Sequence, residues 1–141
     1  MRAVVQRVLS ASVSVAGEVV GAIDEPGLLV YLGVTHDDGD REIAWTAAKI
    51  RDLRLLREER SVADVGAPVL VVSQFTLYGD GRKGRRPTWL AAAPEPVSRP
   101  AYEAVCAELE RSGIRVERGV FGADMQVTSV GDGPVTLIVE T

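Results

Sequence analysis

Residues 73–76 (S-Q-F-T), directly after an apolar run, carry groups that suit ester chemistry. The end of a buried strand is a rigid place from which backbone N–H groups and short hydroxyl side chains can be aimed at a substrate. Backbone N–H groups that stabilise an oxyanion contribute about 3 to 4 kcal/mol per donor. As nucleophiles the two hydroxyls are poor candidates, because the sequence offers no neighbouring base. We expect a pocket wall at Ser73, Gln74, Phe75 and Thr76; otherwise the hydroxyls merely hydrogen-bond the strand end.

A second chemical feature is the segment 131–136 (G-D-G-P-V-T), which precedes the last apolar run. Gly and Asp are common where a turn needs positive φ, so the segment alone predicts a turn between two strands. Pro134 beside a strong strand pattern is unusual for a plain two-residue hairpin. A Gly-Pro bond can be cis at modest cost, and a cis bond would turn two successive carbonyl groups in an unusual direction. The sequence leaves the isomer of Gly133–Pro134 open.

Four cations within five positions follow S-Q-F-T in a glycine-rich segment: Arg82, Lys83, Arg85 and Arg86. The whole chain has a net charge of −4, so general affinity for nucleic acid is not expected. A concentrated basic segment in an acidic protein can instead bind a few phosphates at one place, including the end of an RNA, with an affinity that falls as salt rises. A solvated, flexible loop is the alternative interpretation.

Residues that usually bind metals or act as general bases are scarce in this chain. His36 is the only histidine and lies in a polar turn, and Cys106 is the only cysteine. We therefore expect no metal site and no cofactor, and a His-dependent triad would need His36 itself. We interpret His36 as a solvated loop residue and Cys106 as a small packing residue rather than a nucleophile.

The chain's length of 141 residues fits one domain, and we expect residues 1–141 to form it. The composition, with 46% hydrophobic and 26% charged residues, is typical of a globular protein. No apolar run approaches the roughly 20 residues of a membrane span. Gln6 and Arg7 interrupt the apolar residues that a secretion signal would need. We expect a cytoplasmic protein without membrane contacts.

β patterns dominate the chain. Ala16-Gly17 separates the first two strands, which are predicted to form a hairpin. The next two strands are continuous apolar runs, typical of central strands covered on both faces. G-D-G-P joins the last two. The expected strands are residues 4–15, 18–23, 27–34, 68–75, 115–121, 125–130 and 135–140.

Two helices interrupt the strands. Asp40 can cap the first, whose apolar residues Ile43, Ala47, Ile50 and Leu53 share one face. The second is expected from Ser98 to Gly113, with Pro100 in its first turn. Its expected apolar face is Ala101, Tyr102, Val105, Cys106 and Leu109. Three arginines, Arg51, Arg54 and Arg57, are interpreted as a solvated helix face that could extend the basic segment.

The fold class that these elements predict is α/β. We expect one mixed domain, with mainly antiparallel β-sheets packed as a sandwich or curled into a barrel and two main helices outside.

Nearly the whole chain resembles the D-aminoacyl-tRNA deacylase, or D-tyrosyl-tRNA(Tyr) deacylase, family. Several segments match that family in its order, and such ordered matches are specific. These segments are V-V-Q-R-V, G-L-L-V-Y-L-G-V, V-L-V-V-S-Q-F-T-L-Y-G-D-G-R-K-G-R-R-P-T, F-G-A-D-M-Q-V and G-D-G-P-V-T. The resemblance implies a hydrolase that removes D-amino acids from tRNA, a form of chiral proofreading in translation quality control.

The family's members are homodimers, so the resemblance implies a second copy of this chain as a partner, beside the 3′ end of an aminoacyl-tRNA. It implies that Gly133 and Pro134, in cis form, reach into the partner's pocket. There the two carbonyl groups would face the substrate's α-carbon and leave no room for an L side chain, which is selection by rejection.

The resemblance also assigns roles to single residues. Arg7 would brace the Gly-Pro loop, and Ser73, Gln74, Phe75 and Thr76 would line the ester side of the pocket. Phe121 and Met125 would hold the terminal adenosine, although the residues alone favour a core position for both. Thr136 belongs to the same motif, so the resemblance places it with Gly133 and Pro134 in substrate binding and chiral selection. Hydrolysis would rely largely on the RNA, with the 2′-hydroxyl of the terminal ribose helping to activate water.

Two segments depart from the family pattern. Gly131 precedes Asp132 where the family usually has Asn-Asp, which could loosen the loop. Residues 56–66 are shorter than their counterpart and lack its Met-Asn segment. The expected substrates are D-aminoacyl esters and, in addition, glycyl-tRNA, which has no side chain to exclude. Two other functions compete: an esterase with Ser73 or Thr76 as covalent nucleophile, and a non-catalytic RNA-binding module.

Overall fold

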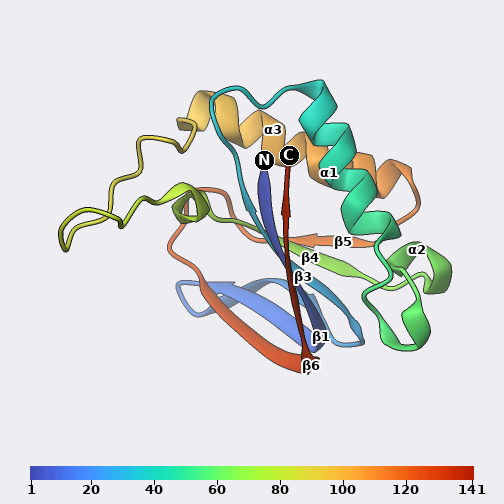
Figure 1. The fold of residues 1–141 in the computed structure, drawn as a ribbon. Coiled ribbons are helices and arrows are strands. Elements are labelled where there is room, and N and C mark those ends of the chain that lie inside the picture. The colour runs from blue at the N-terminus through green and yellow to red at the C-terminus, as the bar shows by residue number, and fades with distance from the viewer.

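The first strand organises the sheet, because β1 (Arg2–Val15) pairs with three others. In the computed structural model, which describes residues 1–141, its first half pairs with β3 and its second half with β2, while β6 runs along its other edge. These pairings are antiparallel; β3–β4 and β4–β5 are parallel. Figure 1 shows the resulting sheet with the helices outside it. The strands are β2 (Glu18–Ile23), β3 (Gly27–Gly33), β4 (Val69–Ser73), β5 (Val116–Arg118) and β6 (Gln126–Glu140).

The sheet curls until its ends nearly meet, which resolves the choice between sandwich and barrel. β2 and β5 lie at the two ends of the strand order. A β-carbon added at Gly21 of β2 would collide with the carbonyl oxygen of Arg118 in β5, so the two strands approach closely without pairing. The protein is a single mixed α/β domain with a nearly closed barrel, as the sequence predicts.

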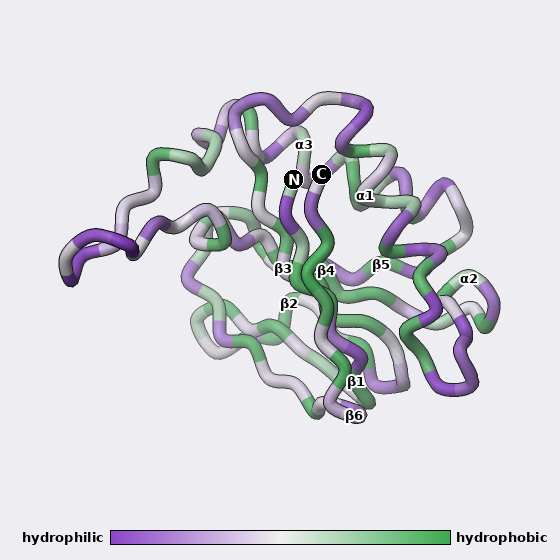
Figure 2. Tube along the Cα trace, in the orientation of Figure 1, coloured by the Kyte–Doolittle hydropathy of each residue, from purple (hydrophilic) through white to green (hydrophobic).

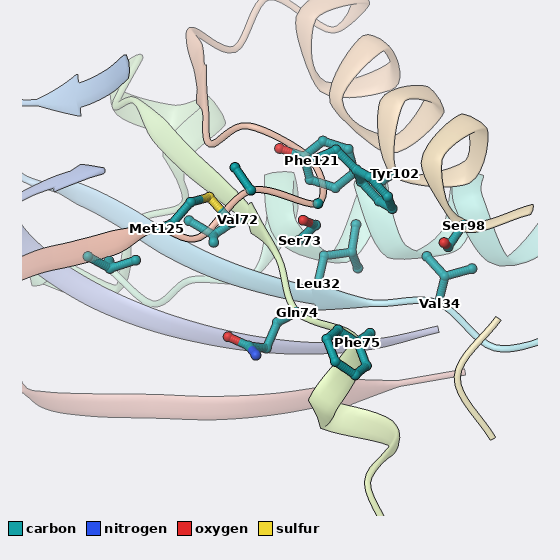
Figure 3. Close-up of a pocket in the computed structure, with 13 residues that line it drawn as sticks. Leu32, Val34, Val72, Ser73, Gln74, Phe75, Ser98, Tyr102, Phe121 and Met125 are labelled. Atoms are coloured by element: carbon teal, nitrogen blue, oxygen red, sulfur yellow. The ribbon is translucent and has the colours of Figure 1, made fainter. Parts of the chain in front are cut away.

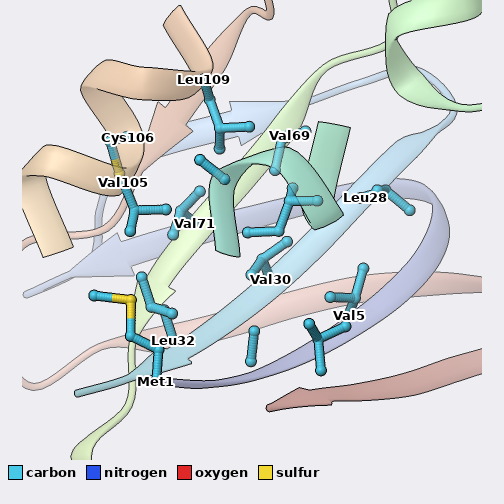
Figure 4. Close-up of a cluster of buried hydrophobic side chains, with 14 of the residues drawn as sticks. Met1, Val5, Leu28, Val30, Leu32, Val69, Val71, Val105, Cys106 and Leu109 are labelled. Carbon is cyan, nitrogen blue, oxygen red and sulfur yellow. The ribbon is translucent and has the colours of Figure 1, made fainter. Parts of the chain in front are cut away.

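Apolar side chains fill two layers. The strand pair β3–β4 supplies both, because neighbouring residues on a strand point to opposite faces. Val30 and Val71 face α1 (Asp40–Asp52) and α3 (Glu95–Arg111), as Figure 4 shows, whereas Leu29 and Leu70 face the barrel interior. This arrangement confirms that the two continuous apolar runs are central strands.

The helices keep their predicted apolar faces but not all of their predicted ends. On α1, Ala47 and Ile50 are buried, and on α3 all five predicted residues are buried, including Cys106. Gly39, not Asp40, is the N-cap of α1. α3 begins at Glu95 rather than Ser98, because proline is tolerated in a first turn and the Pro94 carbonyl already accepts the N–H of Ser98 at 2.9 Å. Pro100 therefore lies beyond the first turn.

Two further predictions for the last forty residues are wrong. G-D-G-P does not join two strands: residues 126–140 form one strand, β6, because β1 continues unbroken beside it. Opposite Gln6 lies Thr136 and opposite Val8 lies Gly131, so residues 132–135 bulge out across from Arg7 alone. The expected strand 115–121 is shortened to β5, and Gly119 adds one last hydrogen bond to the Val71 carbonyl.

The segment between α1 and β4 forms short elements: η1 (Arg57–Glu59) and α2 (Val62–Val65). A third short helix, η2 (Phe75–Tyr78), follows β4. Residues 79–93, which we call the arm, extend away from the barrel toward the left of Figure 1, and Figure 2 shows that the tip is hydrophilic. None of the helices combines the length and apolar character that crossing a membrane requires.

Candidate active site

A pocket of about 270 Å³ lies at the carboxyl ends of the parallel strands β3 and β4, beside the first turns of α3 (Figure 3). Crevices at this end of parallel strands are common ligand sites, since loops diverge there. Nine of its thirteen lining residues are hydrophobic, as in most small-molecule sites. The thirteen lining residues are Leu32, Val34, Val72, Ser73, Gln74, Phe75, Ser98, Tyr102, Phe121, Gly122, Ala123, Met125 and Val127.

One wall comes from the point where β4 ends. Ser73 is the last residue of β4, and the N–H of Gln74 makes the final hydrogen bond to β3, at 2.8 Å from the Leu32 carbonyl oxygen. The chain then turns into η2, which places Phe75 at the edge of the pocket with 56% of its surface exposed. The structure thus brings Ser73, Gln74 and Phe75 to one wall.

Thr76 lies outside this wall. Its side chain is exposed, it does not line the pocket, and its hydroxyl oxygen accepts a hydrogen bond from Nε2 of Gln74 at 2.5 Å. Thr76 therefore contacts the site through Gln74. By contrast, the hydroxyl of Ser73 makes no hydrogen bond within the chain. The alternative interpretation of the sequence, in which this hydroxyl only hydrogen-bonds the strand end, expects one.

The opposite wall is aromatic and thioether in character. Phe121 and Met125 are half-buried and pack against the core, yet both also face the pocket. The ring of Phe121 lies 5.8 Å from that of Tyr102, centroid to centroid, and the guanidinium of Arg99 lies 5.0 Å from its centroid. Phe121 and Met125 therefore pack against the core and line the pocket at the same time.

The pocket has no side chain that titrates near neutral pH. Tyr102 is the one ionisable residue in the lining, and burial raises the pKa of its hydroxyl well above the ordinary value. That hydroxyl donates a hydrogen bond to the Val71 carbonyl at 2.9 Å. Burial also raises the pKa of Cys106 to about 11, so this thiol stays protonated in the core. Ser73 consequently has no general base beside it.

The Gly133–Pro134 pair lies on the bulge of β6, exposed and outside its own chain's pocket. The peptide bond between them is cis. Gly133 has φ +143°, and a β-carbon there would lie 2.8 Å from the Val135 nitrogen and 3.0 Å from Nη2 of Arg7. The backbone conformation and the crowding together require glycine at this position.

Asp132 fixes the bulge through two arginines. Nε of Arg7 donates to the Asp132 carbonyl oxygen at 2.8 Å, and Nη1 of Arg7 donates to the Leu55 carbonyl at 3.2 Å. Arg57 makes a two-pronged ion pair with the Asp132 carboxylate, at 2.5 and 3.1 Å. The hydrogen bond from Arg57 holds the pKa of this carboxyl below its usual value. Only 8% of Asp132 is exposed.

Sequence reasoning missed the role of Arg57. It expects Arg51, Arg54 and Arg57 on one solvated helix face, but α1 ends at Asp52 and Arg57 lies in η1. Arg57 meets a partner 75 positions away, and no local pattern indicates such a contact. The segment 56–66 therefore supplies a brace for the bulge through Arg57. Gly131 has open space around it, so no neighbouring group packs against this position.

The remaining predicted site residues lie on the surface. Thr136 is exposed and its hydroxyl accepts from Nε2 of Gln6 at 3.2 Å. On the arm, Arg82 pairs with Asp80, whereas Lys83, Arg85 and Arg86 form no ion pair. Nε2 of the exposed His36 lies 2.9 Å from the Leu90 carbonyl oxygen. No group of three His, Cys, Asp or Glu side chains is arranged to hold a metal ion.

Comparisons with known proteins cover the whole chain. Residues 4–140 match the family model described as D-Tyr-tRNA(Tyr) deacylase. The D-aminoacyl-tRNA deacylases of Thermobifida fusca and Kineococcus radiotolerans are 63% and 62% identical to this chain over 140 residues, with 99% of both sequences aligned in each case.

Two solved structures share the fold of this chain. One described as c-Myc DNA Unwinding Element Binding Protein is 38% identical, with a TM-score of 0.93 over 100% of this chain and 99% of that one. A probable eukaryotic D-amino acid tRNA deacylase, at 16% identity, shares the fold with a TM-score of 0.88 over 98% and 97% of the two chains. From the full-length match to the family model and the two close relatives, the chain belongs to the D-Tyr-tRNA(Tyr) deacylase family of hydrolases.

Proposed function

We propose that this protein hydrolyses the ester bond of D-aminoacyl-tRNA and releases the free D-amino acid and the tRNA. Family membership supports this activity. The proposed mechanism rests on one observation: Ser73 lines a mostly apolar pocket that contains no general base. An aminoacyl ester is already activated, so positioning it beside hydrogen-bond donors can suffice for hydrolysis. The first N–H groups of η2, which have no acceptor within the helix, are candidates for stabilising the oxyanion.

The RNA itself completes the chemistry in this proposal. The 2′-hydroxyl of the terminal ribose helps to activate the attacking water, a task that no pocket side chain can perform at neutral pH. Phe121 and Met125 hold the terminal adenosine on the wall opposite Ser73. The unpaired cations of the arm, Lys83, Arg85 and Arg86, contact tRNA phosphates together with Arg82. The protein acts in the cytoplasm, where charged tRNA is used.

Chiral selection takes place across two subunits. The Gly133–Pro134 bulge is exposed and lies outside the pocket of its own chain, which supports a homodimer in which it enters the partner's pocket. Its two carbonyl groups then face the α-carbon of the substrate, and an L side chain collides with them. Glycine has no side chain to reject, so we propose glycyl-tRNA as a second substrate. The braces from Arg7 and Arg57 keep the bulge in place.

Incubation with D-tyrosyl-tRNA tests the activity. We expect release of D-tyrosine at a rate well above the spontaneous hydrolysis of D-tyrosyl-tRNA. A protein that binds the tRNA but releases no amino acid would be an RNA-binding module. The Ser73→Ala and Thr76→Ala variants test the esterase alternative. RNA-assisted hydrolysis predicts substantial remaining activity in both. Near-complete loss, together with an acyl-enzyme trapped on the wild-type residue, would make that residue a covalent nucleophile.

A further inference from the structure

Two exposed aromatic side chains contact each other at the edge of the pocket. Phe75 lines the pocket, and Trp89 on the arm lies against it, edge to face, with 5.5 Å between the ring centroids. Exposed fractions are 56% for Phe75 and 42% for Trp89, so each ring keeps free surface. Figure 3 shows Phe75 at the outer end of the site, where β4 passes into η2. Large aromatic surface in this position is available for a ligand.

The Trp89 ring is held rather than loosely attached. It lies over Gly79, where a β-carbon would come within 2.5 Å of the ring, so only glycine leaves room for it. A pair of backbone hydrogen bonds between Asp80 and Thr88, at 2.9 and 3.0 Å, joins the two sides of the arm beside it. A ring fixed in this way loses little conformational freedom when a ligand stacks on it.

Unpaired cations lie further out on the same arm as Trp89, in an otherwise acidic protein. Lys83, Arg85 and Arg86 lie in the loop beyond the Asp80–Thr88 bridge, at the outer end of the arm, and only their neighbour Arg82 forms an ion pair. The chain as a whole has a net charge of −4. An aromatic platform and unpaired cations along one segment are the combination with which proteins bind single-stranded nucleic acid.

We propose that Trp89, supported by Phe75, stacks the base of the nucleotide that immediately precedes the terminal nucleoside of the tRNA. This inference rests on the proposed function, in which the terminal adenosine occupies the pocket beside Phe121. The unpaired 3′ strand leaves the pocket past Phe75, meets the Trp89 ring, and continues along the arm cations. Trp89 is thus a substrate-binding residue that lies outside the pocket lining.

A comparison of two substrates tests the proposal. The Trp89→Ala variant should raise the KM for D-tyrosyl-tRNA about tenfold, with kcat nearly unchanged, because it removes one base–aromatic stack. The KM for D-tyrosyl-adenosine, which has no preceding nucleotide, should stay at the wild-type value. Trp89→Phe should retain most of the affinity for the tRNA. Leu90→Ala, which changes the neighbouring exposed apolar residue, is the matched control and should have no effect.

Other outcomes would overturn the proposal. Equal losses on both substrates would show that Trp89 acts through Phe75 and the pocket wall. A changed oligomeric state of Trp89→Ala in sedimentation would assign the ring to a contact between subunits. If the wild-type protein hydrolyses neither substrate, the proposed function fails, and that failure is distinct from any result for Trp89.

A binding measurement stands independently of catalysis. The chain has two tryptophans, and Trp45 lies on α1 beside Lys49, so Trp45→Phe leaves Trp89 as the single indole. Titration of this variant at low salt with the trinucleotide C-C-A should quench its fluorescence, whereas adenosine alone should not. Quenching by adenosine to the same degree, or no quenching by C-C-A, would contradict the proposed stack.

Discussion

At the residue scale, three charged side chains hold the exposed Gly133–Pro134 bulge in place. Arg7 donates to the Asp132 carbonyl, and Arg57 pairs with the Asp132 carboxylate. The side chain of Arg7 is 12% exposed, whereas that of Arg57 is 71% exposed. The two arginines therefore contribute unequally, because solvent screens the outer pair more strongly.

The first prediction concerns this brace. Arg7→Ala should lower the hydrolysis of D-tyrosyl-tRNA by roughly 10- to 100-fold, since small displacements of a positioning group are costly, and it should raise the relative rate on L-tyrosyl-tRNA. Arg57→Ala should cause the same change to a smaller degree. Steady-state rates on the two substrates measure both effects. Arg51→Ala, which removes an exposed pair with Asp52, should leave the ratio unchanged; a similar loss there would point to general destabilisation.

The second prediction is a pH dependence. The hydrogen bond from Arg57 lowers the pKa of Asp132 in the folded protein. The stability that this pair contributes is therefore present above the unfolded pKa of about 3.9 and is lost as pH falls through the folded pKa. Discrimination between D- and L-tyrosyl-tRNA should therefore be constant from about pH 5 to 8. Asp132→Asn should remove the difference in thermal stability between neutral and acidic pH that this carboxylate causes. A discriminating step that titrates near pH 7 would require another group.

The site residues divide into those that local pattern indicates and those that only the fold brings together. Ser73, Phe75, Phe121 and Met125 converge on one pocket because strand ends and the loop after β5 meet at the same edge of the sheet. Thr76 follows the same motif but points away, since η2 turns the chain after Phe75.

At the element scale, β1 and β6 determine the shape of the molecule. The hairpin, the two central strands and the buried faces of α1 and α3 follow from local periodicity. The continuity of β6 does not, because it depends on a partner strand at the other end of the sequence. A turn motif that is opposed by an unbroken strand becomes a bulge, and this is how G-D-G-P acquires an exposed position.

The third prediction concerns the layer between helices and sheet. Leu109 on α3 and Ile50 on α1 are fully buried. Replacing either by alanine should lower the free energy of unfolding by about 2 to 5 kcal/mol, the usual cost of a large cavity. Urea titration measures the loss. Glu103→Ala on the exposed face of α3 should stay within about 0.5 kcal/mol of the wild type; equal costs at both positions would contradict the assigned faces.

At the scale of the whole molecule, the pocket and the Gly133–Pro134 bulge lie in different places. The pocket lies at the carboxyl ends of β3 and β4. The Gly133–Pro134 bulge projects from β6 and does not line this pocket. A second copy of the chain can unite them, and a twofold dimer would then contain two shared sites.

The fourth prediction uses mixed dimers. Gly133→Ala should inactivate the bulge, because its φ of +143° and its contacts exclude a β-carbon. Ser73→Tyr should fill the pocket. Each variant alone should be inactive, but unfolding and refolding them together should recover about a quarter of the wild-type activity, since half of the mixed dimers carry one intact site of two. No recovery in a refolded, dimeric mixture would place bulge and pocket in the same subunit.

The relative rate on the two enantiomers tests the central proposal most directly. The purified protein is incubated with D-tyrosyl-tRNA and L-tyrosyl-tRNA under identical conditions, and the amino acid released is measured against time. We predict rapid release of D-tyrosine, and release of L-tyrosine no faster than L-tyrosyl-tRNA hydrolyses without the protein. Equal enzymatic release of both would contradict steric selection by Gly133 and Pro134, and release of neither would contradict the deacylase activity itself.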